Sequence, residues 1–296
     1  MKIGIIGAGS IGLLFGAYLG KNFDVTIFPR RKEQAYQLNN KGITIQNKLE
    51  YHTYVHASID KNELNRQDLL IITVKQYQLE SILKELKNLH NQIPLLFLQN
   101  GMLHLAQINE LNSDYIYVGT IEHGALKVSD TSVQHNGVGK TNIAVFRGKA
   151  KKIEQVLTSN IKDFDFELFP DYEKMLLKKL LINMMINPLT AILKVRNGQL
   201  IENICYNRIF LQLFDEVMLL FPKEHKEKLL KDLLIICNNT KNNESSMLRD
   251  IQLGRRTEID AIAGYLVNLA NEKGVNMPLT KMLIGMIKGM ERGGVK

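Results

Sequence analysis

The sequence predicts an α/β domain followed by an all-helical domain. Three observations support this. The chain opens with a strand, a glycine-rich turn and a helix, and apolar strands with polar ends recur through the first half. After about residue 170 the spacing of apolar residues changes to that of helices. A length of 296 residues suits about two domains. We expect domains of residues 1–169 and 170–296.

The first element is an apolar strand at residues 2–6, and residues 13–19 have helical character. Between them lies a G-x-G-x-x-G motif, formed by Gly7, Ala8, Gly9, Ser10, Ile11 and Gly12. In this context Gly7 makes a tight turn, Gly9 lets the backbone approach a pyrophosphate, and Gly12 allows close helix–strand packing. The N–H groups at the helix N-terminus face the phosphates. The first domain is therefore predicted to be a Rossmann dinucleotide-binding domain.

The same apolar run has the hydropathy of a signal peptide or a membrane span. Its glycines, however, fall where a nucleotide-binding loop needs them. We therefore expect no association with a membrane.

The second strand, at residues 25–28, predicts which dinucleotide is bound. It ends in Pro29, Arg30, Arg31 and Lys32, and the first acid is Glu33. An NAD site would place an acid here to bind the ribose 2′-hydroxyl, whereas arginine pairs with a 2′-phosphate. The pattern favours NADPH over NADH. It leaves open which arginine contacts the phosphate, and a solvated basic turn is the alternative.

Two more apolar strands, at residues 68–75 and 94–101, end in Lys75 and Asn100. Ligands of open α/β sheets lie beyond the carboxyl ends of the strands, so both side chains are candidates for ligand contact. Either could instead cap a turn, since Asn-Gly is a common turn dipeptide. Further strands are expected at residues 115–119, 132–135 and 142–146.

The second half has helical spacing, and helices are expected at residues 172–193, 205–220, 223–237, 249–273 and 278–290. Pro188 predicts a kink or an end of the first helix near Asn187. The polar stretch 238–244 is expected to be a loop, and Ser246 is placed to cap the helix that follows.

Lys179, Asn183 and Asn187 recur every fourth residue in an apolar stretch of the first of these helices. Residues four apart lie on one face of a helix, and buried polar groups are costly unless they are paired. A bound substrate is one partner for this polar stripe. The alternative is that these side chains satisfy neighbouring backbone groups.

Composition narrows the class of protein. The net charge is +8, but no long basic block suggests a nucleic-acid surface. Cys205 and Cys237 are far apart and form neither a disulfide framework nor a metal cluster, and the histidines do not gather with acids. We expect a cytoplasmic protein that binds a small molecule and uses no metal.

Taken together, these segments resemble the ketopantoate reductase (2-dehydropantoate 2-reductase) family of the 6-phosphogluconate-dehydrogenase-like superfamily, over nearly the whole chain. The most specific motifs are Lys179-Leu-Leu-Ile-Asn183-Met-Met-Ile-Asn187-Pro-Leu-Thr, Asn197-Gly198, and Ser245-Ser246-Met-Leu-Arg-Asp with Arg256-Thr257-Glu258-Ile259-Asp260. The amino-terminal glycine motif is shared by many reductases.

The resemblance implies NADPH-dependent reduction of 2-dehydropantoate to pantoate, on the route to pantothenate and coenzyme A. It implies that Lys179 is the general acid and that Glu258 orients the substrate and lies beside the cofactor. It further implies substrate contacts from Asn183, Asn187, Asn197, Ser246 and Asn100, and cofactor contacts from Arg30 or Arg31, Lys75, Gln78 and Asn100. The substrate would lie between the two domains, and a homodimer is possible.

One residue departs from the family pattern: Glu122 stands where the family more often has a threonine. A carboxylate there could alter substrate preference. Two alternative functions remain at this point, a related reductase of another 2-oxo acid and a non-catalytic NADPH-binding sensor.

Overall fold

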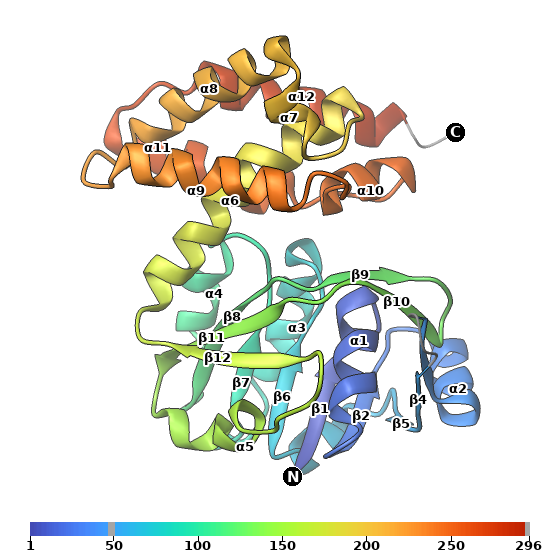
Figure 1. Cartoon of the computed structure of the whole chain (residues 1–296). Helices are drawn as coiled ribbons and strands as arrows, with labels where there is room; N and C mark the ends of the chain where they lie inside the picture. Colours follow the sequence, from blue (N-terminus) through green and yellow to red (C-terminus); the bar gives the residue numbers. More distant parts are fainter. Residues whose placement is uncertain (47–50, 294–296) are drawn as a thin grey trace. The chain divides into compact units, whose positions relative to one another are not determined.

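The computed structural model describes residues 1–46 and 51–293 (Figure 1). The chain forms two compact units. The first unit comprises Met1–Gln99 and His104–Leu176, and the second comprises Asn100–Leu103 and Leu177–Lys296. A short segment that follows a strand of the first unit therefore belongs to the second.

The main sheet of the first unit has eight strands in the order β12-β11-β8-β7-β6-β1-β2-β5. Their bounds are β1 (Lys2–Ile6), β2 (Asp24–Phe28), β5 (His56–Ala57), β6 (Leu69–Ile72), β7 (Leu95–Phe97), β8 (Ile116–Ile121), β11 (Lys140–Arg147) and β12 (Asp165–Phe169). Neighbours pair in parallel, except that β8 and β11 are antiparallel. The predicted parallel α/β sheet is confirmed.

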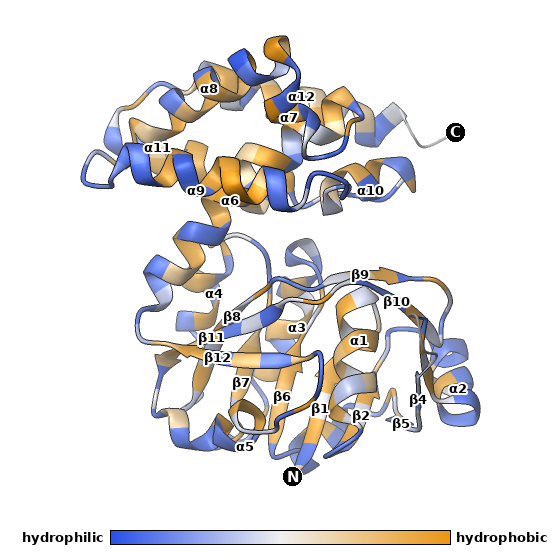
Figure 2. Ribbon diagram, in the orientation of Figure 1, coloured by the Kyte–Doolittle hydropathy of each residue, from blue (hydrophilic) through white to orange (hydrophobic). Residues whose placement is uncertain are grey.

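The helices of this unit are α1 (Ser10–Leu19), α2 (Lys32–Lys41), α3 (Leu79–Leu86), α4 (His104–Asn109) and α5 (Glu154–Leu157), with short 3-10 turns at Lys61–Arg66, Gln76–Gln78 and Ala150–Ile153. Strand β6 is buried along its length, and β1 is buried after its first residue. Figure 2 shows their apolar character. Two predicted strands were too long, because β6 ends at Ile72 and β7 at Phe97. The polar residues after each strand leave the ladder and form loops.

A second sheet was not foreseen from the sequence. It has the order β4-β3-β10-β9 and consists of β3 (Ile43–Gln46), β4 (Tyr51–Thr53), β9 (Gly124–Lys127) and β10 (Ser132–Gly137). Residues 132–135 were correctly expected to be a strand, but they pair outside the main sheet. The sheet packs against α1.

A chain of buried hydrogen bonds joins this sheet to α1. The backbone N–H of Gly139 donates to Nδ1 of His123 (3.2 Å), so that nitrogen is an acceptor. His135 Nε2 lies 3.2 Å from the same atom and can donate to it, and His135 Nδ1 lies 2.8 Å from the Tyr18 hydroxyl. Because its Nδ1 accepts, the His123 imidazole is neutral. Burial, followed by repulsion from His135, lowers the pKa of His123 to about 4.

We expect stability to fall as the pH drops from about 6.5 toward 4. Burial also lowers the pKa of His104 to about 4 and lowers that of His135. Below about pH 6.5 the histidines of the unfolded chain take up protons, while the buried histidines of the folded chain stay neutral. Protonation therefore favours the unfolded state, and the free energy of unfolding is highest above that pH. Each histidine with a pKa near 4 would lower the free energy of unfolding by up to about 3 kcal/mol at pH 4, relative to pH 7.

Urea unfolding at pH 7, 6 and 5 measures this effect before most carboxylates titrate. His104→Leu should flatten the dependence on pH, whereas replacement of the exposed His225 by Gln should not. A free energy of unfolding that is equal at pH 7 and 5 would contradict the expectation.

The second unit is helical. Its elements are α6 (Tyr172–Leu193) from Leu177 onward, α7 (Gln199–Glu202), α8 (Ile204–Met218), α9 (Lys226–Asn239), α10 (Ser246–Gln252), a π-helix at Asp260–Gly264, α11 (Tyr265–Lys273) and α12 (Pro278–Gly293). Helix α6 is long and apolar enough to cross a membrane by length and composition, but 67% of its apolar window is buried. That burial is typical of the core helix of a soluble protein.

Pro188 predicted a kink or an end of helix α6 near Asn187; the helix does not end there but continues to Leu193. A proline removes one backbone hydrogen bond from a helix. The Thr190 hydroxyl donates to the carbonyl oxygens of Ile186 (2.8 Å) and Asn187 (3.1 Å), and so adds bonds where the ladder is weakened. Packing along the buried helix outweighs the local preference.

Three further predictions for the second unit, of a helix, a helix cap and a loop, were wrong in detail. The helix expected at residues 249–273 is interrupted between Gln252 and Ile259, where Gly254 has a φ of +62°. Ser245, not Ser246, caps α10, because its hydroxyl accepts the N–H of Leu248 (3.1 Å). The loop expected at 238–244 begins later, since α9 continues to Asn239.

Candidate functional site

Residues predicted to bind the cofactor follow neighbouring strands of the main sheet. The glycine motif follows β1, Arg30 follows β2, and Lys75 follows β6, and these strands lie in the order β6-β1-β2. Parallel strands deliver their carboxyl ends to one edge, which is where α/β sheets bind ligands.

The glycine loop has the geometry predicted for it. Gly7 has a φ of +111°, and a Cβ on Gly12 would lie 1.8 Å from the Gly7 carbonyl oxygen. Only glycine allows α1 to start this close to β1. Gly9 is exposed, and a Cβ on it would meet no atom within 4 Å. The open space beside the N-terminus of α1 suits a pyrophosphate.

Side chains that the sequence did not single out hold this loop in place. The Thr73 hydroxyl donates to the Gly7 carbonyl oxygen (3.0 Å), and Gln34 Nε2 donates to that of Ala8 (3.0 Å). Lys127 of β9 donates from its backbone N–H to the Ser10 hydroxyl (3.0 Å) and from Nζ to Ala8 (3.2 Å). No local motif marks these residues, because they come from three distant segments.

The two arginines after β2 have different surroundings. Arg31 lies 2.5 Å from Asp130, which also pairs with Lys127 at 2.9 Å. Partial burial raises the pKa of Asp130, but the hydrogen bonds from Lys127 and Arg31 outweigh it and lower that pKa overall. Arg30 is exposed and has no ion-pair partner among residues 1–46 and 51–293.

Lys75 and Gln78 lie at the two ends of a tight turn after β6, where the Gln78 N–H donates to the Lys75 carbonyl oxygen (2.9 Å). Gln99, after β7, donates from Nε2 to the carbonyl oxygens of Ile72 (3.0 Å) and Val74 (2.9 Å). These bonds fix the start of the loop that carries Lys75.

Within the second unit, the fold brings three predicted substrate residues together. Asn100 donates from Nδ2 to Glu258 Oε2 (2.8 Å) and accepts on Oδ1 from Asn183 Nδ2 (3.4 Å). These residues are 158 and 83 positions apart along the chain. The bonds orient the Asn100 amide, so donors and a carboxylate converge at one place.

Asn100 is held there by the glycine that follows it. Gly101 has a φ of +82°, and a Cβ on it would lie 2.1 Å from the carbonyl oxygen of Ala261, in the π-helix. The turn therefore lies directly against the element that follows Glu258. Single turns of π-helix are frequent at functional sites.

The polar stripe of α6 contributes to the same group. Asn183 and Asn187 are buried, with exposed fractions of 7% and 6%, and Lys179 is half-buried one turn before Asn183. Asn183 bonds a side-chain amide rather than a backbone group of its own helix. That contact favours the functional interpretation of the stripe over the backbone one.

Two predicted substrate residues make other contacts. Asn197 Nδ2 donates to the Thr240 hydroxyl (3.0 Å), and its Oδ1 is buried with no hydrogen bond among the described residues. Ser246 is exposed in the first turn of α10. Glu122, in the first unit, accepts a hydrogen bond from Asn142 Nδ2 (2.9 Å).

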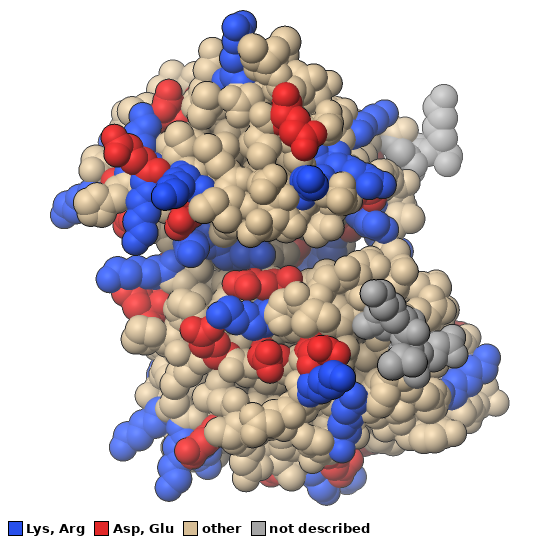
Figure 3. Space-filling view, in the orientation of Figure 1, with Lys and Arg blue, Asp and Glu red and all other residues tan. Residues whose placement is uncertain are grey.

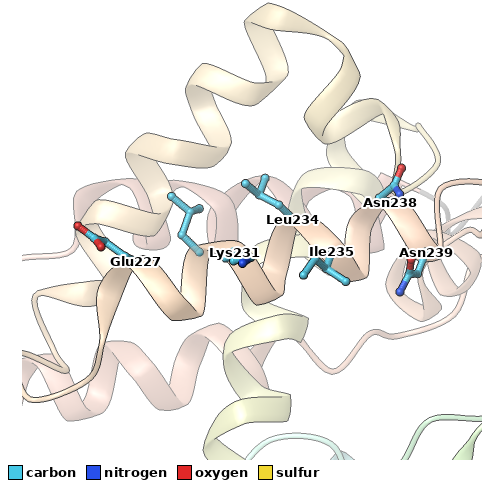
Figure 4. Close-up of a pocket in the computed structure, with 7 residues that line it drawn as sticks. Glu227, Lys231, Leu234, Ile235, Asn238 and Asn239 are labelled. Atoms are coloured by element: carbon cyan, nitrogen blue, oxygen red, sulfur yellow. The ribbon is translucent and has the colours of Figure 1, made fainter.

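A groove of about 550 Å³ lies elsewhere, along α9 (Figure 4). Its lining consists of Glu227, Leu230, Lys231, Leu234, Ile235, Asn238 and Asn239. None of these residues belongs to the predicted site.

Comparison with known proteins identifies the family. The family model described as "Ketopantoate reductase PanE/ApbA" matches residues 3–148, and the model described as "Ketopantoate reductase PanE/ApbA C terminal" matches residues 171–291. The chain belongs to the ketopantoate reductase family. It is 39% identical to a 2-dehydropantoate 2-reductase of Bacillus subtilis over 99% of this chain and 98% of that protein. It is 38% identical to one of Listeria innocua over 98% and 97%.

Solved structures share the fold. A probable 2-dehydropantoate 2-reductase from Bacillus subtilis aligns with a TM-score of 0.88 and 37% identity, covering 98% of this chain and 100% of that one. A D-mandelate dehydrogenase with NADH and anilino(oxo)acetate aligns with a TM-score of 0.88 at 22% identity, covering 99% of both chains. At that identity the second likeness shows the fold alone.

Proposed function

We propose that the protein reduces 2-dehydropantoate to pantoate with NADPH, on the route to pantothenate and coenzyme A in the cytoplasm. The observation that carries the proposal is the hydrogen-bonded group of Asn100, Asn183 and Glu258, with Lys179 one turn away on α6. Family membership supports the choice of substrate.

The residues fit the demands of carbonyl reduction. The bound dinucleotide supplies a hydride to the ketone carbon. Lys179 is the proposed donor of the proton to the carbonyl oxygen. Its ammonium group also stabilises the negative charge that develops on that oxygen. Glu258 accepts hydrogen bonds from substrate hydroxyls, and the amides of Asn183 and Asn187 can bind a carboxylate or hydroxyl.

The preference for NADPH is assigned to Arg30. Its guanidinium is exposed and unpaired among the described residues, whereas Arg31 is held by Asp130. We expect Arg30→Ala to raise the KM for NADPH about tenfold or more while leaving the KM for NADH nearly unchanged, since only NADPH carries the 2′-phosphate. Arg31→Ala is the matched comparison and should have the smaller effect. An equal loss for both cofactors would contradict this assignment.

Small molecules are the expected partners. On the face in Figure 3, basic side chains are interspersed with acidic ones on both units. Family membership favours a small anionic substrate. A homodimer stays a prediction, which light scattering after size-exclusion chromatography would test.

Oxidation of NADPH, followed at 340 nm with 2-dehydropantoate, pyruvate and 2-oxoisovalerate in parallel, tests the proposed reaction. Fast turnover of 2-dehydropantoate alone supports it. Faster turnover of another oxo acid would show that the proposed substrate is wrong, while the proposed type of reaction would stand. Tight NADPH binding without turnover of any oxo acid would instead favour a sensor.

A further inference from the structure

We infer that Glu291, near the end of α12, is a positioning residue that holds Glu258 in place for substrate binding. The inference rests on the proposed function, because that function gives Glu258 its role. Glu291 bonds Thr257, and its effect passes through the backbone that carries Glu258.

The anchoring contact is a pair of short hydrogen bonds to Thr257, the residue before Glu258. Glu291 Oε1 accepts the backbone N–H of Thr257 (2.7 Å) and its hydroxyl (2.6 Å). Thr257 is only 3% exposed, and its hydroxyl oxygen also accepts the N–H of Ile259 (3.2 Å). The backbone is therefore tied on both sides of Glu258.

The arrangement is a helix cap completed from a distant part of the chain. In a capping box, a Ser or Thr bonds an N–H of the first turn, and an acid three residues later accepts the N–H of that Ser or Thr. Here the third residue after Thr257 is Asp260, whose carboxylate pairs with Lys288 (2.7 Å) and Arg256 (3.6 Å) instead. Glu291 takes its place from 34 residues along the chain.

Helix α12 is well suited to act as the support, because its other end is fixed in the same way. Glu216 of α8, 8% exposed, accepts the N–H of Leu279 (2.8 Å), the N–H of Thr280 (2.7 Å) and the Thr280 hydroxyl (2.8 Å). Hydrogen bonds to a carboxylate are stronger than neutral ones. Helix α12 thus joins α8 to the segment that bears Glu258.

Glu258 depends on this support because its own segment is irregular. Residues 253–258 form no helix or strand, between α10 and the helical turns that begin at Ile259. Without Glu291, two buried donors of Thr257 lose their acceptor, which is costly. Relaxation of the segment would move Glu258 relative to Asn100, whose amide it binds at 2.8 Å.

The experiment compares Glu291→Ala and Glu291→Gln with Glu272→Ala, an exposed acid on α11. We expect Glu291→Ala to raise the KM for 2-dehydropantoate about tenfold, equivalent to 1.4 kcal/mol, with a smaller change in kcat. Glu291→Gln should lose less, because its amide oxygen can still accept the Thr257 N–H. Glu272→Ala should match the wild type.

A double-mutant cycle with Glu258→Gln separates positioning from a general loss of stability. If Glu291 acts through Glu258, the two changes are strongly non-additive in KM. Fully additive effects, or an unchanged KM in Glu291→Ala, would overturn the inference.

Hydrogen exchange gives a second readout that needs no substrate. The amides of residues 257–259 should exchange faster in Glu291→Ala than in the wild type, and at wild-type rates in Glu272→Ala. Unchanged exchange would overturn the anchoring role. A wild-type protein that does not turn over 2-dehydropantoate would instead refute the proposed function, while exchange still decides whether Glu291 anchors the segment. If Glu291→Ala does not fold, both the KM for 2-dehydropantoate and the hydrogen exchange are measured on Glu291→Gln instead.

Discussion

Replacing Lys179 by alanine is expected to lower kcat for 2-dehydropantoate at least about a hundredfold, the usual contribution of a positioned general acid. Lys179 is half-buried one turn before Asn183 on α6. Its loss removes both the proton and the positive charge that stabilises the developing oxyanion. Steady-state kinetics at saturating NADPH measures the effect.

Lys178 provides the matched control, because it is the preceding residue on the same helix but is exposed. Lys178→Ala should keep near-wild-type turnover. Lys179→Arg keeps the positive charge but donates a proton poorly near neutral pH, so it should bind substrate better than Lys179→Ala while remaining slow. Near-normal turnover by Lys179→Ala would remove the residue from its assigned role.

The features predicted correctly from the sequence depend on neighbours along the chain. The glycine loop is one: its turn and its close helix–strand packing need glycine at Gly7 and Gly12 whatever surrounds them. The stripe of Lys179, Asn183 and Asn187 is another, because helical periodicity alone places these side chains together. Local rules therefore predicted the sheet, the cofactor loop and the main polar helix.

The features missed depend on contacts between distant segments. The break after Gln252 lies in a stretch with helical spacing, and it is stabilised by Glu291 from another helix. The proline of α6 is tolerated because the helix is packed in the core. Likewise, Lys127 and Gln34 reach the glycine loop from elements that carry no recognisable motif. Periodicity and turn propensity contain no information about such partners.

The assembly of Asn100 with Glu258 lies between these two cases. The sequence pointed to both residues, but only the fold shows that Asn100 belongs to the helical unit and bonds Glu258 directly. The Asn-Gly dipeptide left an ordinary turn as the alternative to ligand contact. Its glycine is instead required by a close approach to the backbone of Ala261.

That approach makes Gly101→Ala the second change with a large expected effect. A left-handed φ costs a non-glycine residue roughly 1–2 kcal/mol. Here the new Cβ would also lie 2.1 Å from the carbonyl oxygen of Ala261, which belongs to a buried backbone and cannot rotate away. Overpacking of this kind costs about 1–3 kcal/mol more. We expect a loss of about 2–5 kcal/mol in unfolding free energy.

Gly274→Ala separates the clash from the backbone strain. Gly274 also has a positive φ, of +67°, but a Cβ there would meet nothing within 4 Å. It should cost about 1 kcal/mol and leave turnover unchanged. In Gly101→Ala the displaced turn carries Asn100 away from Glu258, and a shift of about 1 Å can reduce turnover on the order of a hundredfold. If the two variants lost equal stability and both kept full activity, the contact with Ala261 would not hold Asn100 in place.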